Sequence, residues 1–326
     1  MIQNSDRLYS ILESFLGSGK LNTISGEAVF FCPNCHHRKR KLCINVKNGC
    51  YHCWTCDLRG RNIANLIIQY GNPNMLREFY EISKKFLNIV YDSDIIDNLF
   101  GDKKEIAKKV DLPPKFRPIW EESINPNRNN ILRYLRMRGI KDNLIRLFNI
   151  GWSDHWKYEN RVIIPSYNMD GELNYYISRT IYNDISGNTK KYLNCETPWS
   201  TIIPFELYVN WNRDLTIVEG VFDFMKHVDN NVIPLLGNNL SSMLLTRIIK
   251  SNINVYVMLD SDMRKKAIDL CTLLSSFDIK VYFSDMERSG YKDPSEIGED
   301  EFLFVRDENL VEYNWELLLY KELEGI

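Results

Sequence analysis

The stretch Cys32-Pro33-Asn34-Cys35 is followed, after residues 36–52, by Cys53-Trp54-Thr55-Cys56. Two C-x2-C pairs at this separation are typical of a zinc site, because each turn directs two thiolates at one ion and two turns complete a tetrahedron. Between the pairs, residues 42–46 have strand character and Lys47-Asn48-Gly49 has turn character, a pattern that favours the hairpin of a zinc ribbon. We therefore predict one structural zinc ion, held by Cys32, Cys35, Cys53 and Cys56.

Other side chains in this segment could replace one of the four ligands. The candidates are Cys43, Cys50, His36, His37 and His52. The spacing favours the two C-x2-C pairs, and Cys43 lies in an alternating strand, where a small buried apolar residue is the simpler interpretation. Because four thiolates leave no open coordination position, we expect the zinc ion to be structural rather than catalytic.

The same segment is strongly basic. Residues 32–61 contain one acidic residue, Asp57, and the cations Arg38, Lys39, Arg40, Lys41, Lys47, Arg59 and Arg61. The aromatic residues Tyr51 and Trp54 lie among them, and cations combined with stacking aromatics suit single-stranded nucleic acid. A solvated basic loop with a buried aromatic is the alternative.

Bulk properties restrict the class of protein. The chain has 326 residues, 44% of them hydrophobic and 26% charged, which is enough for two or three domains with their own cores. No apolar run reaches the length of about 18 residues that a membrane span needs, and residues 1–6 do not resemble a signal peptide. We expect a cytoplasmic protein without a membrane partner. Because the net charge is −2, any contact with nucleic acid requires local basic patches.

The hydrophobic pattern divides the chain into five parts. Residues 1–90 combine the zinc ribbon with flanking helices, and residues 91–118 are lysine-rich, contain Pro113-Pro114 and are predicted to be a linker. Residues 119–213 predict a mixed α/β subdomain with two helices at 128–148 and a hairpin that turns at Asp170-Gly171. In residues 214–298 short apolar strands alternate with helices, which indicates a parallel sheet covered on both faces. Residues 299–326 predict a helical segment. The expected fold class is therefore multidomain, α+β and α/β.

Acidic residues follow two of the predicted parallel strands. Glu219 follows the strand at 216–218, and Asp260 and Asp262 follow the strand at 255–259. Ligands of such sheets bind at the carboxyl ends of the strands, and carboxylates gathered there repel one another unless a cation is present. Oxygen ligands of this kind indicate a catalytic Mg²⁺ or Mn²⁺. Asp223, one helical turn after Glu219, could support the site, whereas a helix N-cap with solvated acids is the alternative interpretation of Asp-Ser-Asp.

These motifs, taken in order, resemble those of bacterial-type DNA primases. Residues 218–223, Leu236-Gly237, residues 259–262 and residues 292–296 are similar to the successive motifs of a TOPRIM domain. The segments at 159–165 and 191–194, with Gly171 and Arg179, resemble the basic subdomain that precedes TOPRIM in primases. The four-cysteine ribbon resembles the primase zinc-binding domain. The layout is similar to that of a stand-alone bacteriophage primase.

The resemblance implies a DNA-directed RNA polymerase that makes short RNA primers on single-stranded DNA during replication. It implies metal-dependent nucleotidyl transfer at Glu219, Asp260 and Asp262, and contacts with nucleotide or template at Arg161, Arg179, Lys191 and Asn194. The implied partners are single-stranded template, ribonucleoside triphosphates, a replicative helicase and single-strand-binding protein. A TOPRIM-type nuclease or topoisomerase-like enzyme is the first alternative, and a non-catalytic zinc-ribbon protein is the second.

Two features depart from the primase pattern. The usual Asp-Gly-Asp is Asp260-Ser261-Asp262, and the small, glycine-containing segment that normally follows is Met263-Arg264-Lys265-Lys266. In related primases a helicase-binding domain follows TOPRIM, whereas residues 299–326 are the only part of this chain after the last motif.

Overall fold

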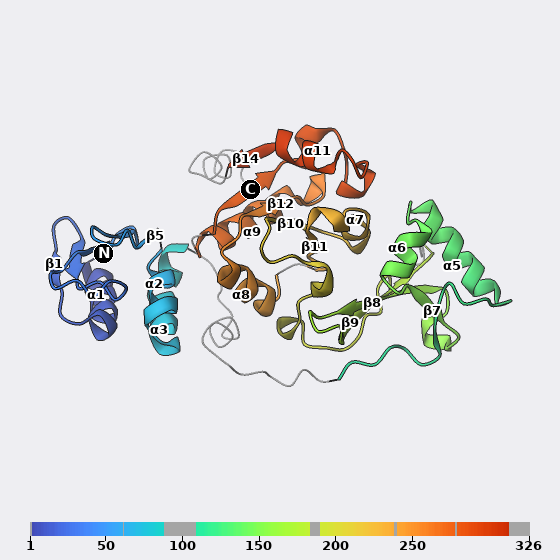
Figure 1. The fold of residues 1–326 in the computed structure, drawn as a ribbon, viewed down its shortest axis with the longest axis horizontal. Helices are drawn as coiled ribbons and strands as arrows, with labels where there is room; N and C mark the ends of the chain where they lie inside the picture. Colours follow the sequence, from blue (N-terminus) through green and yellow to red (C-terminus); the bar gives the residue numbers. More distant parts are fainter. Residues whose placement is uncertain are drawn as a thin grey trace. The chain divides into compact units, whose positions relative to one another are not determined.

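The structure is a computed structural model that describes residues 2–60, 62–87, 109–182, 190–237, 240–277 and 279–312 (Figure 1). The chain divides into two compact units, one of Met1–Lys103 with Thr272–Lys280 and one of Lys104–Cys271 with Val281–Ile326. Within the described ranges, no helix has both the length and the apolar character that crossing a bilayer requires. The elements of both units are given below, and they confirm the predicted fold class, a zinc-ribbon-like sheet followed by mixed α/β structure.

The first unit contains an antiparallel sheet with strand order β1-β2-β3-β4-β5. Its described elements are α1 (Ile2–Leu16), β1 (Lys20–Asn22), β2 (Glu27–Phe30), β3 (Leu42–Asn45), β4 (Tyr51–Cys53), β5 (Arg59–Gly60), α2 (Ile63–Tyr70) and α3 (Pro73–Leu87). The predicted hairpin is present, because β3 pairs with β4 and Gly49 adopts a φ of 79° in the turn between them. Asn45 stabilises this turn by accepting hydrogen bonds from the backbone N–H groups of Lys47 and Asn48. Leu12, Phe30, Leu42 and Ile44 are fully buried in this unit.

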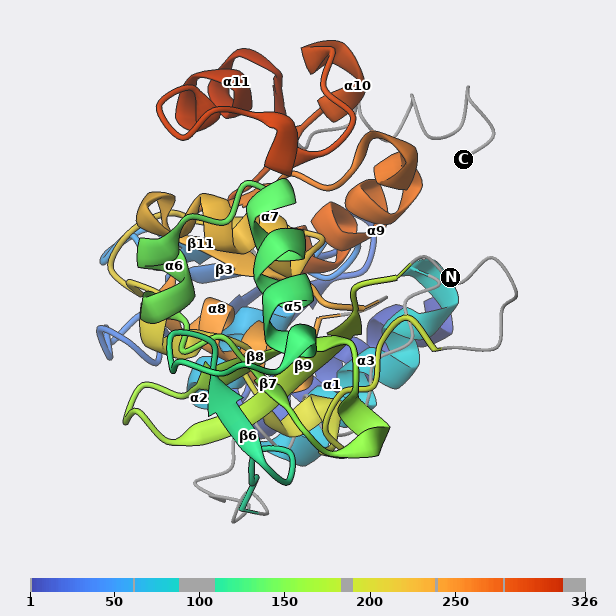
Figure 2. The same ribbon diagram turned by 90° about the vertical axis from the view of Figure 1, so that its right-hand side faces the viewer.

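The second unit begins with a four-stranded antiparallel sheet in the order β6-β7-β8-β9. Its elements are β6 (Phe116–Pro118), α5 (Pro126–Met137), α6 (Asp142–Leu147), β7 (Gly151–Ser153), β8 (Arg161–Tyr167) and β9 (Leu173–Thr180). The predicted helical region is confirmed as α5 and α6, which Figures 1 and 2 show side by side, with Gly139 at a φ of 74° between them. Gly171, at a φ of 78°, lies in the predicted Asp-Gly turn between β8 and β9.

A second sheet of this unit has the order β11-β10-β12-β13-β14. Strands β10 (Leu215–Val218), β11 (Val232–Pro234), β12 (Val255–Val257) and β13 (Val281–Ser284) are parallel, and β14 (Leu310–Glu312) is antiparallel to β13. All four residues of β10 are buried, as expected for a central strand covered on both faces. The helices that alternate with the strands are α7 (Val221–Lys226), α8 (Ser242–Ser251), α9 (Arg264–Ser275), α10 (Met286–Ser289) and α11 (Phe302–Glu308). Short 3₁₀ turns are η1 (Trp156–Tyr158), η2 (Trp199–Thr201), η3 (Glu206–Tyr208), η4 (Val228–Asn230), η5 (Ser261–Met263) and η6 (Pro294–Glu296).

One hydrophobic core joins the two sheets of the second unit. It includes Ile131 from α5, Val162 from β8, Val218 from β10, Phe222 from α7 and Phe302 from α11. Burial of large apolar side chains is the main favourable contribution to folding, so the shared core places the two sheets in one folding unit. The basic subdomain and the parallel sheet are thereby held against each other, and both border the site described below.

Two segments differ from the sequence prediction. Phe116–Pro118, which we assigned to the linker at 91–118, forms β6 and pairs with β7. Leu310–Glu312, which we assigned to a helical segment, forms the edge strand β14. Residues 88–108 of the predicted linker and residues 313–326 of the predicted C-terminal helix lie outside the described residues.

Candidate functional site

Four cysteine sulfurs converge in the first unit. The sulfurs of Cys32, Cys35, Cys53 and Cys56 all lie within 4.8 Å of one another, and no other metal-binding group of this kind occurs among the described residues. Cys32 Sγ is 3.6 Å from Cys56 Sγ, and Cys35 Sγ is 3.9 Å from Cys53 Sγ. A tetrahedral ion with Zn–S bonds of about 2.3 Å would separate its sulfurs by about 3.8 Å. The four side chains therefore fit a zinc ion in number, type and spacing.

The backbone builds both cysteine turns in the same way. The residue after each pair, His36 or Asp57, has a positive φ, 49° and 59° respectively. Its N–H donates to the carbonyl of the first cysteine, Cys32 or Cys53, at 3.0 and 3.1 Å. This reversal turns two sulfurs toward the same point, which explains why the motif spacing predicts the site.

Local hydrogen bonds favour the thiolate form at one ligand. The pKa of the Cys56 thiol is lowered to about 6, first by the backbone N–H of Leu58 and then by the Asn34 side chain, whose Nδ2 lies 3.5 Å from Cys56 Sγ. Burial instead raises the pKa of Cys32 to about 12. A buried thiol of this kind ionises readily when it binds a metal, because the cation replaces the lost hydration of the thiolate.

The alternative zinc ligands are engaged elsewhere or lie outside the cluster. Cys43 Sγ accepts a hydrogen bond from Trp54 Nε1 at 3.3 Å, and His52 Nε2 lies 2.9 Å from Asp57 Oδ1. Cys50, His36 and His37 are also absent from the sulfur cluster. The geometry therefore selects the two C-x2-C pairs among the ligands that the sequence left open.

The surface of the ribbon presents two exposed aromatic rings, those of Trp54 and Phe31. Trp54 is 69% exposed, and its ring lies 4.3 Å from that of His52 in an edge-on arrangement. The Arg40 guanidinium lies 4.7 Å from the ring centre of Phe31, which is 39% exposed. Tyr51, the other aromatic residue that the sequence suggested for stacking, is buried and faces the core. Among the described residues of the first unit, Trp54 and Phe31 are thus the exposed large aromatic side chains.

Carboxylates gather at the carboxyl ends of β10 and β12 in the second unit. These two strands pair directly, so Glu219, which follows β10, and Asp260, which follows β12, lie at the same edge of the sheet. Asp223 lies in the first turn of α7, where its Oδ2 accepts the Gly220 N–H at 2.8 Å. A Cβ atom at residue 220 would lie 2.7 Å from this Oδ2, so glycine allows the close approach. The Ser261 N–H donates to Lys292 O at 3.0 Å and links this edge to the loop of residues 292–296.

Two carboxylate oxygens at this edge are buried and have no hydrogen-bond partner, Glu219 Oε2 and Asp260 Oδ1. The pKa of Asp260 is raised to about 7, first by burial and then by the negative charges of Asp223, Glu219, Asp293 and Asp262. Burial is also the main cause that raises the pKa of Asp223 to about 6. An unpaired buried oxygen and mutual repulsion are both costly, and a divalent cation would relieve both.

The oxygens do not form a closed cage. Among the described residues, only the four cysteines have ligand atoms that all lie within 4.8 Å of one another. Asp262 lies in η5 and is exposed, whereas Asp260 and Glu219 are partly buried. This open arrangement suits Mg²⁺, which keeps several waters and commonly takes one or two carboxylates together with substrate phosphates.

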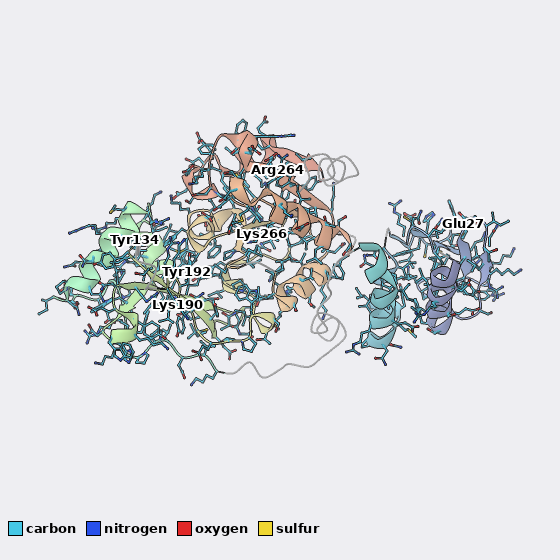
Figure 3. The ribbon with its side chains drawn as sticks, turned by 180° about the vertical axis from the view of Figure 1, so that it is seen from behind. Glu27, Tyr134, Lys190, Tyr192, Arg264 and Lys266 are labelled. Carbon is cyan, nitrogen blue, oxygen red and sulfur yellow. The ribbon has the colours of Figure 1, made fainter. Side chains whose placement is uncertain are left out.

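Cations border the carboxylates from two directions. On α9, Lys266 Nζ lies 3.6 Å from Glu219 Oε1. From the segment after β9, Lys191 is close enough that Asp260 and Glu219 act to raise its pKa, although burial, Arg179 and Arg138 together lower it. Figure 3 shows Lys266 on α9, and Tyr192 and Tyr134 on the neighbouring basic subdomain.

Two guanidinium groups flank the ring of Phe222 in α7. Those of Arg138 and Arg179 lie 5.3 Å and 5.2 Å from its centre. Arg179 also donates to the hydroxyl of Tyr192 at 2.9 Å, and Arg138 lies over Tyr134. Sequence analysis identified Arg179 but missed Arg138. The pair Arg136 and Arg138 was the available signal, yet the position of Arg138 beside Phe222 depends on tertiary packing.

The other two predicted contact residues support the backbone in this structure. Arg161 is buried, and its guanidinium donates to the carbonyl oxygens of Lys190, at 2.7 Å, and of Ser178 and Lys191, each at 3.5 Å. Asn194 Oδ1 accepts the backbone N–H of Ser178 at 3.1 Å. Both side chains therefore hold the segment that carries Lys191 against β9.

Comparisons with known proteins agree with the sequence motifs. No protein-family profile matches the chain. The DNA primase of Buchnera aphidicola subsp. Baizongia pistaciae is 21% identical over 277 residues, which cover 71% of this chain and 47% of that protein. The DNA primase of Buchnera aphidicola subsp. Acyrthosiphon pisum is 24% identical over 158 residues, which cover 48% of this chain and 26% of that protein. The chain thus spans half or less of the length of these relatives.

Among solved structures, the zinc-binding and RNA polymerase domains of Aquifex aeolicus primase match with a TM-score of 0.50 and 17% identity. The match covers 98% of this chain and 88% of that chain, and it shows a shared fold. Similarity to curated primases and a fold shared with both primase domains confirm the resemblance to bacterial-type primases.

Proposed function

We propose that this chain is a DNA primase, a DNA-directed RNA polymerase that synthesises short RNA primers on single-stranded DNA. The observation that carries the proposal is the carboxylate edge with its two unpartnered buried oxygens, bordered by the cations of the basic subdomain. Nucleotidyl transfer needs both a metal site and nearby positive side chains, because together they offset the negative charge of the nucleoside triphosphate. Similarity to primases in sequence and fold supports the same conclusion.

Glu219, Asp260 and Asp262 are the proposed ligands of Mg²⁺ or Mn²⁺. Bound there, the ions would neutralise charge on the triphosphate and activate the primer hydroxyl. The protein supplies the positions of these oxygens, because β10 and β12 are fixed side by side in a buried parallel sheet. Asp223 anchors the first turn of α7 through its bond to the Gly220 N–H and keeps the chain after Glu219 in place.

Arg138, Arg179 and Lys191 are the proposed contacts of the nucleotide phosphates. A guanidinium group can donate two parallel hydrogen bonds to a phosphate, and both groups already lie close to the Phe222 ring without substrate. Preorganised positive charge of this kind stabilises the negative charge that develops as pyrophosphate leaves. Arg161 and Asn194 act indirectly in this proposal, since they hold the backbone that carries Lys191.

The zinc ribbon is the proposed template-binding module. Its structural zinc ion, held by the four cysteines, would fix the turn that carries Trp54. The exposed indole can stack on a base while the lysine and arginine side chains of the same basic segment contact the phosphate backbone. By resemblance, the further partners are a replicative helicase and single-strand-binding protein.

We also propose a functional division of the chain. Residues 1–90 bind template, a linker precedes β6, and the subdomain up to residue 213 together with the sheet at 214–298 performs synthesis. The support is the continuous core that joins the basic subdomain and the parallel sheet in the second unit. Of residues 299–326, α11 contributes Phe302 to the core of the second unit and β14 extends its sheet, so this segment supports the catalytic region in the proposed division.

The test is incubation of the zinc-loaded full chain with single-stranded DNA, labelled ribonucleoside triphosphates and Mg²⁺. A primase makes short RNA that is sensitive to alkali and complementary to the template. Cleaved DNA without RNA would instead support the nuclease alternative. Binding of DNA with neither product would support the non-catalytic alternative.

A further inference from the structure

The side chain of Lys266 connects α9 to the carboxyl ends of two strands. Its Nζ lies 3.6 Å from Glu219 Oε1, after β10, and donates to the carbonyl oxygen of Gly237, after β11, at 2.8 Å. The side chains of Lys266 and Glu219 are only 20% and 25% exposed. The ammonium group is therefore held at the edge of the sheet where the carboxylates gather.

Glu219 has two oxygens in different situations. Oε1 faces Lys266, whereas Oε2 is buried without a hydrogen-bond partner. Within the described part of the chain, Lys266 is the cation paired with this carboxylate. A metal ion bound by Glu219 and the ammonium group of Lys266 would therefore contact the same carboxylate, although both are positively charged.

Two interactions hold the ammonium group of Lys266. Besides its contact with Glu219, it donates a hydrogen bond to the Gly237 carbonyl, and Lys266 lies in the first turn of α9, which begins at Arg264. The neighbouring Lys265, in contrast, is exposed on the same helix. Lys266 is thus tied to the ends of two strands, and its ammonium group lies beside the Glu219 carboxylate.

We propose that Lys266 is a tethered counter-ion that competes with a divalent cation for Glu219 and so sets the metal concentration at which the catalytic site fills. This inference rests on the proposed function, because it takes the carboxylate edge as a metal site. When no metal is bound, the ammonium offsets part of the repulsion among the carboxylates. When a metal ion binds, the same ammonium repels it and weakens its binding.

The proposal is tested by measuring the affinity of the zinc-loaded full chain for Mn²⁺ in the absence of nucleotide. Titration calorimetry and the electron paramagnetic resonance signal of free Mn²⁺ both report this affinity. Two variants remove the charge in different ways. Lys266→Met removes charge and hydrogen bond, and Lys266→Gln removes the charge but keeps a donor for the Gly237 carbonyl. Lys265→Met is the matched control. Circular dichroism and thermal melting establish that each variant is folded.

We expect both Lys266 variants to bind Mn²⁺ about fivefold more tightly, equivalent to about 1 kcal/mol, with Lys265→Met unchanged. Unchanged or weaker binding in the Lys266 variants would overturn the proposal. Tighter binding in Lys266→Met alone would also overturn it, because the tether rather than the charge would then be the cause.

A further variant separates this inference from the proposed function. Glu219→Gln should abolish the Mn²⁺ binding that is attributed to the carboxylate edge. If wild-type protein shows no binding that depends on Glu219, the proposed metal centre fails, and the role of Lys266 fails with it. If binding depends on Glu219 but does not respond to Lys266, only the counter-ion proposal is wrong.

Discussion

The imidazole of His227 donates a hydrogen bond from Nε2 to the carbonyl oxygen of Pro294 at 2.9 Å. The ring is buried and stacks on Phe302, with 4.0 Å between the ring centres. Through this bond the end of α7 supports the loop of residues 292–296, which is linked to the carboxylate edge by the Ser261–Lys292 hydrogen bond. His227 therefore connects the helix after Glu219 to the loop beside Asp260.

This environment makes stability depend on pH. Burial is the main cause that lowers the pKa of His227, and Lys226 also lowers it, whereas the Pro294 hydrogen bond and Glu299 act in the opposite direction. Between the lowered pKa and the unfolded value of about 6.5, the unfolded chain binds a proton that the folded chain does not. Stability from this group is thus complete above pH 6.5 and is lost as the pH falls below that value.

We expect the melting temperature of the wild-type protein to fall more steeply between pH 7 and pH 5 than that of His227→Gln, whose amide can still donate to Pro294. One proton limits the difference to about 1.4 kcal/mol per pH unit. His155→Gln, at a histidine that does not contact Pro294, is the matched control for the substitution itself. Equal slopes for wild type and His227→Gln would show that His227 does not titrate as argued.

The zinc site is tested by removing one ligand. Cys53→Ser should lose the zinc ion, because three thiolates and a hydroxyl hold it far less strongly than four thiolates. Since structural zinc contributes directly to folding, the first unit should unfold locally. Metal analysis should find one zinc per wild-type chain, and Cys43→Ser, whose sulfur lies outside the cluster, should retain it. Full zinc content in Cys53→Ser would refute the ligand set.

Template binding is tested at Trp54. Stacking of one base on an aromatic ring contributes about 1–3 kcal/mol, so Trp54→Ala should weaken binding of single-stranded DNA by about tenfold or more. Ile24→Ala is the matched control, because Ile24 is an apolar side chain of the same unit that is 88% exposed but has no ring. Fluorescence anisotropy with a labelled oligonucleotide measures both. Equal affinity for Trp54→Ala and wild type would remove Trp54 from the proposed surface.

Nucleotide binding is tested at Arg138. Its guanidinium lies over the ring of Phe222 and, in our proposal, donates hydrogen bonds to the nucleotide phosphates. Arg138→Met should therefore raise the KM for ribonucleoside triphosphates by about tenfold. Arg136→Met is the control, because Arg136 pairs with Asp142 at 3.5 Å on the exposed face of the same region. Steady-state rates of primer synthesis at varied nucleotide concentration give the KM of each variant. A KM that changes equally in both variants would indicate a general charge effect.

Much of the fold could be predicted because its signals are local. The C-x2-C pairs determine the cysteine turns within a few residues, and Asp170-Gly171 specifies a tight hairpin. Short apolar strands followed by helices indicated the parallel sheet, and this periodicity placed Glu219 and Asp260 at strand ends. The same local reasoning failed for Phe116–Pro118, where nearby prolines indicated a linker although the three residues pair with β7. It also failed for Leu310–Glu312, a short edge strand whose partner is β13.

The parts of the site that sequence analysis missed depend on distant contacts. Arg138 lies beside Phe222 only because α5 and α7 pack in one core, and no local pattern shows this. In the sequence, Lys266 was noted only as part of Met263-Arg264-Lys265-Lys266, a departure from the primase pattern, and its contact with Glu219 appears only in the folded structure. The buried position of Tyr51 and the backbone contacts of Arg161 are likewise consequences of tertiary packing.

Primer synthesis by Asp260→Asn is the measurement that tests the central claim most directly. This substitution keeps the shape of the side chain but removes its charge, so metal-dependent nucleotidyl transfer should fall at least about a hundredfold. Binding of single-stranded DNA should remain near the wild-type value, because it depends on the basic ribbon, and Asp229→Asn, on the exposed surface, should synthesise primers normally. Loss of synthesis with retained DNA binding is the result that the account predicts. A folded Asp260→Asn protein that makes primers at the wild-type rate would contradict it.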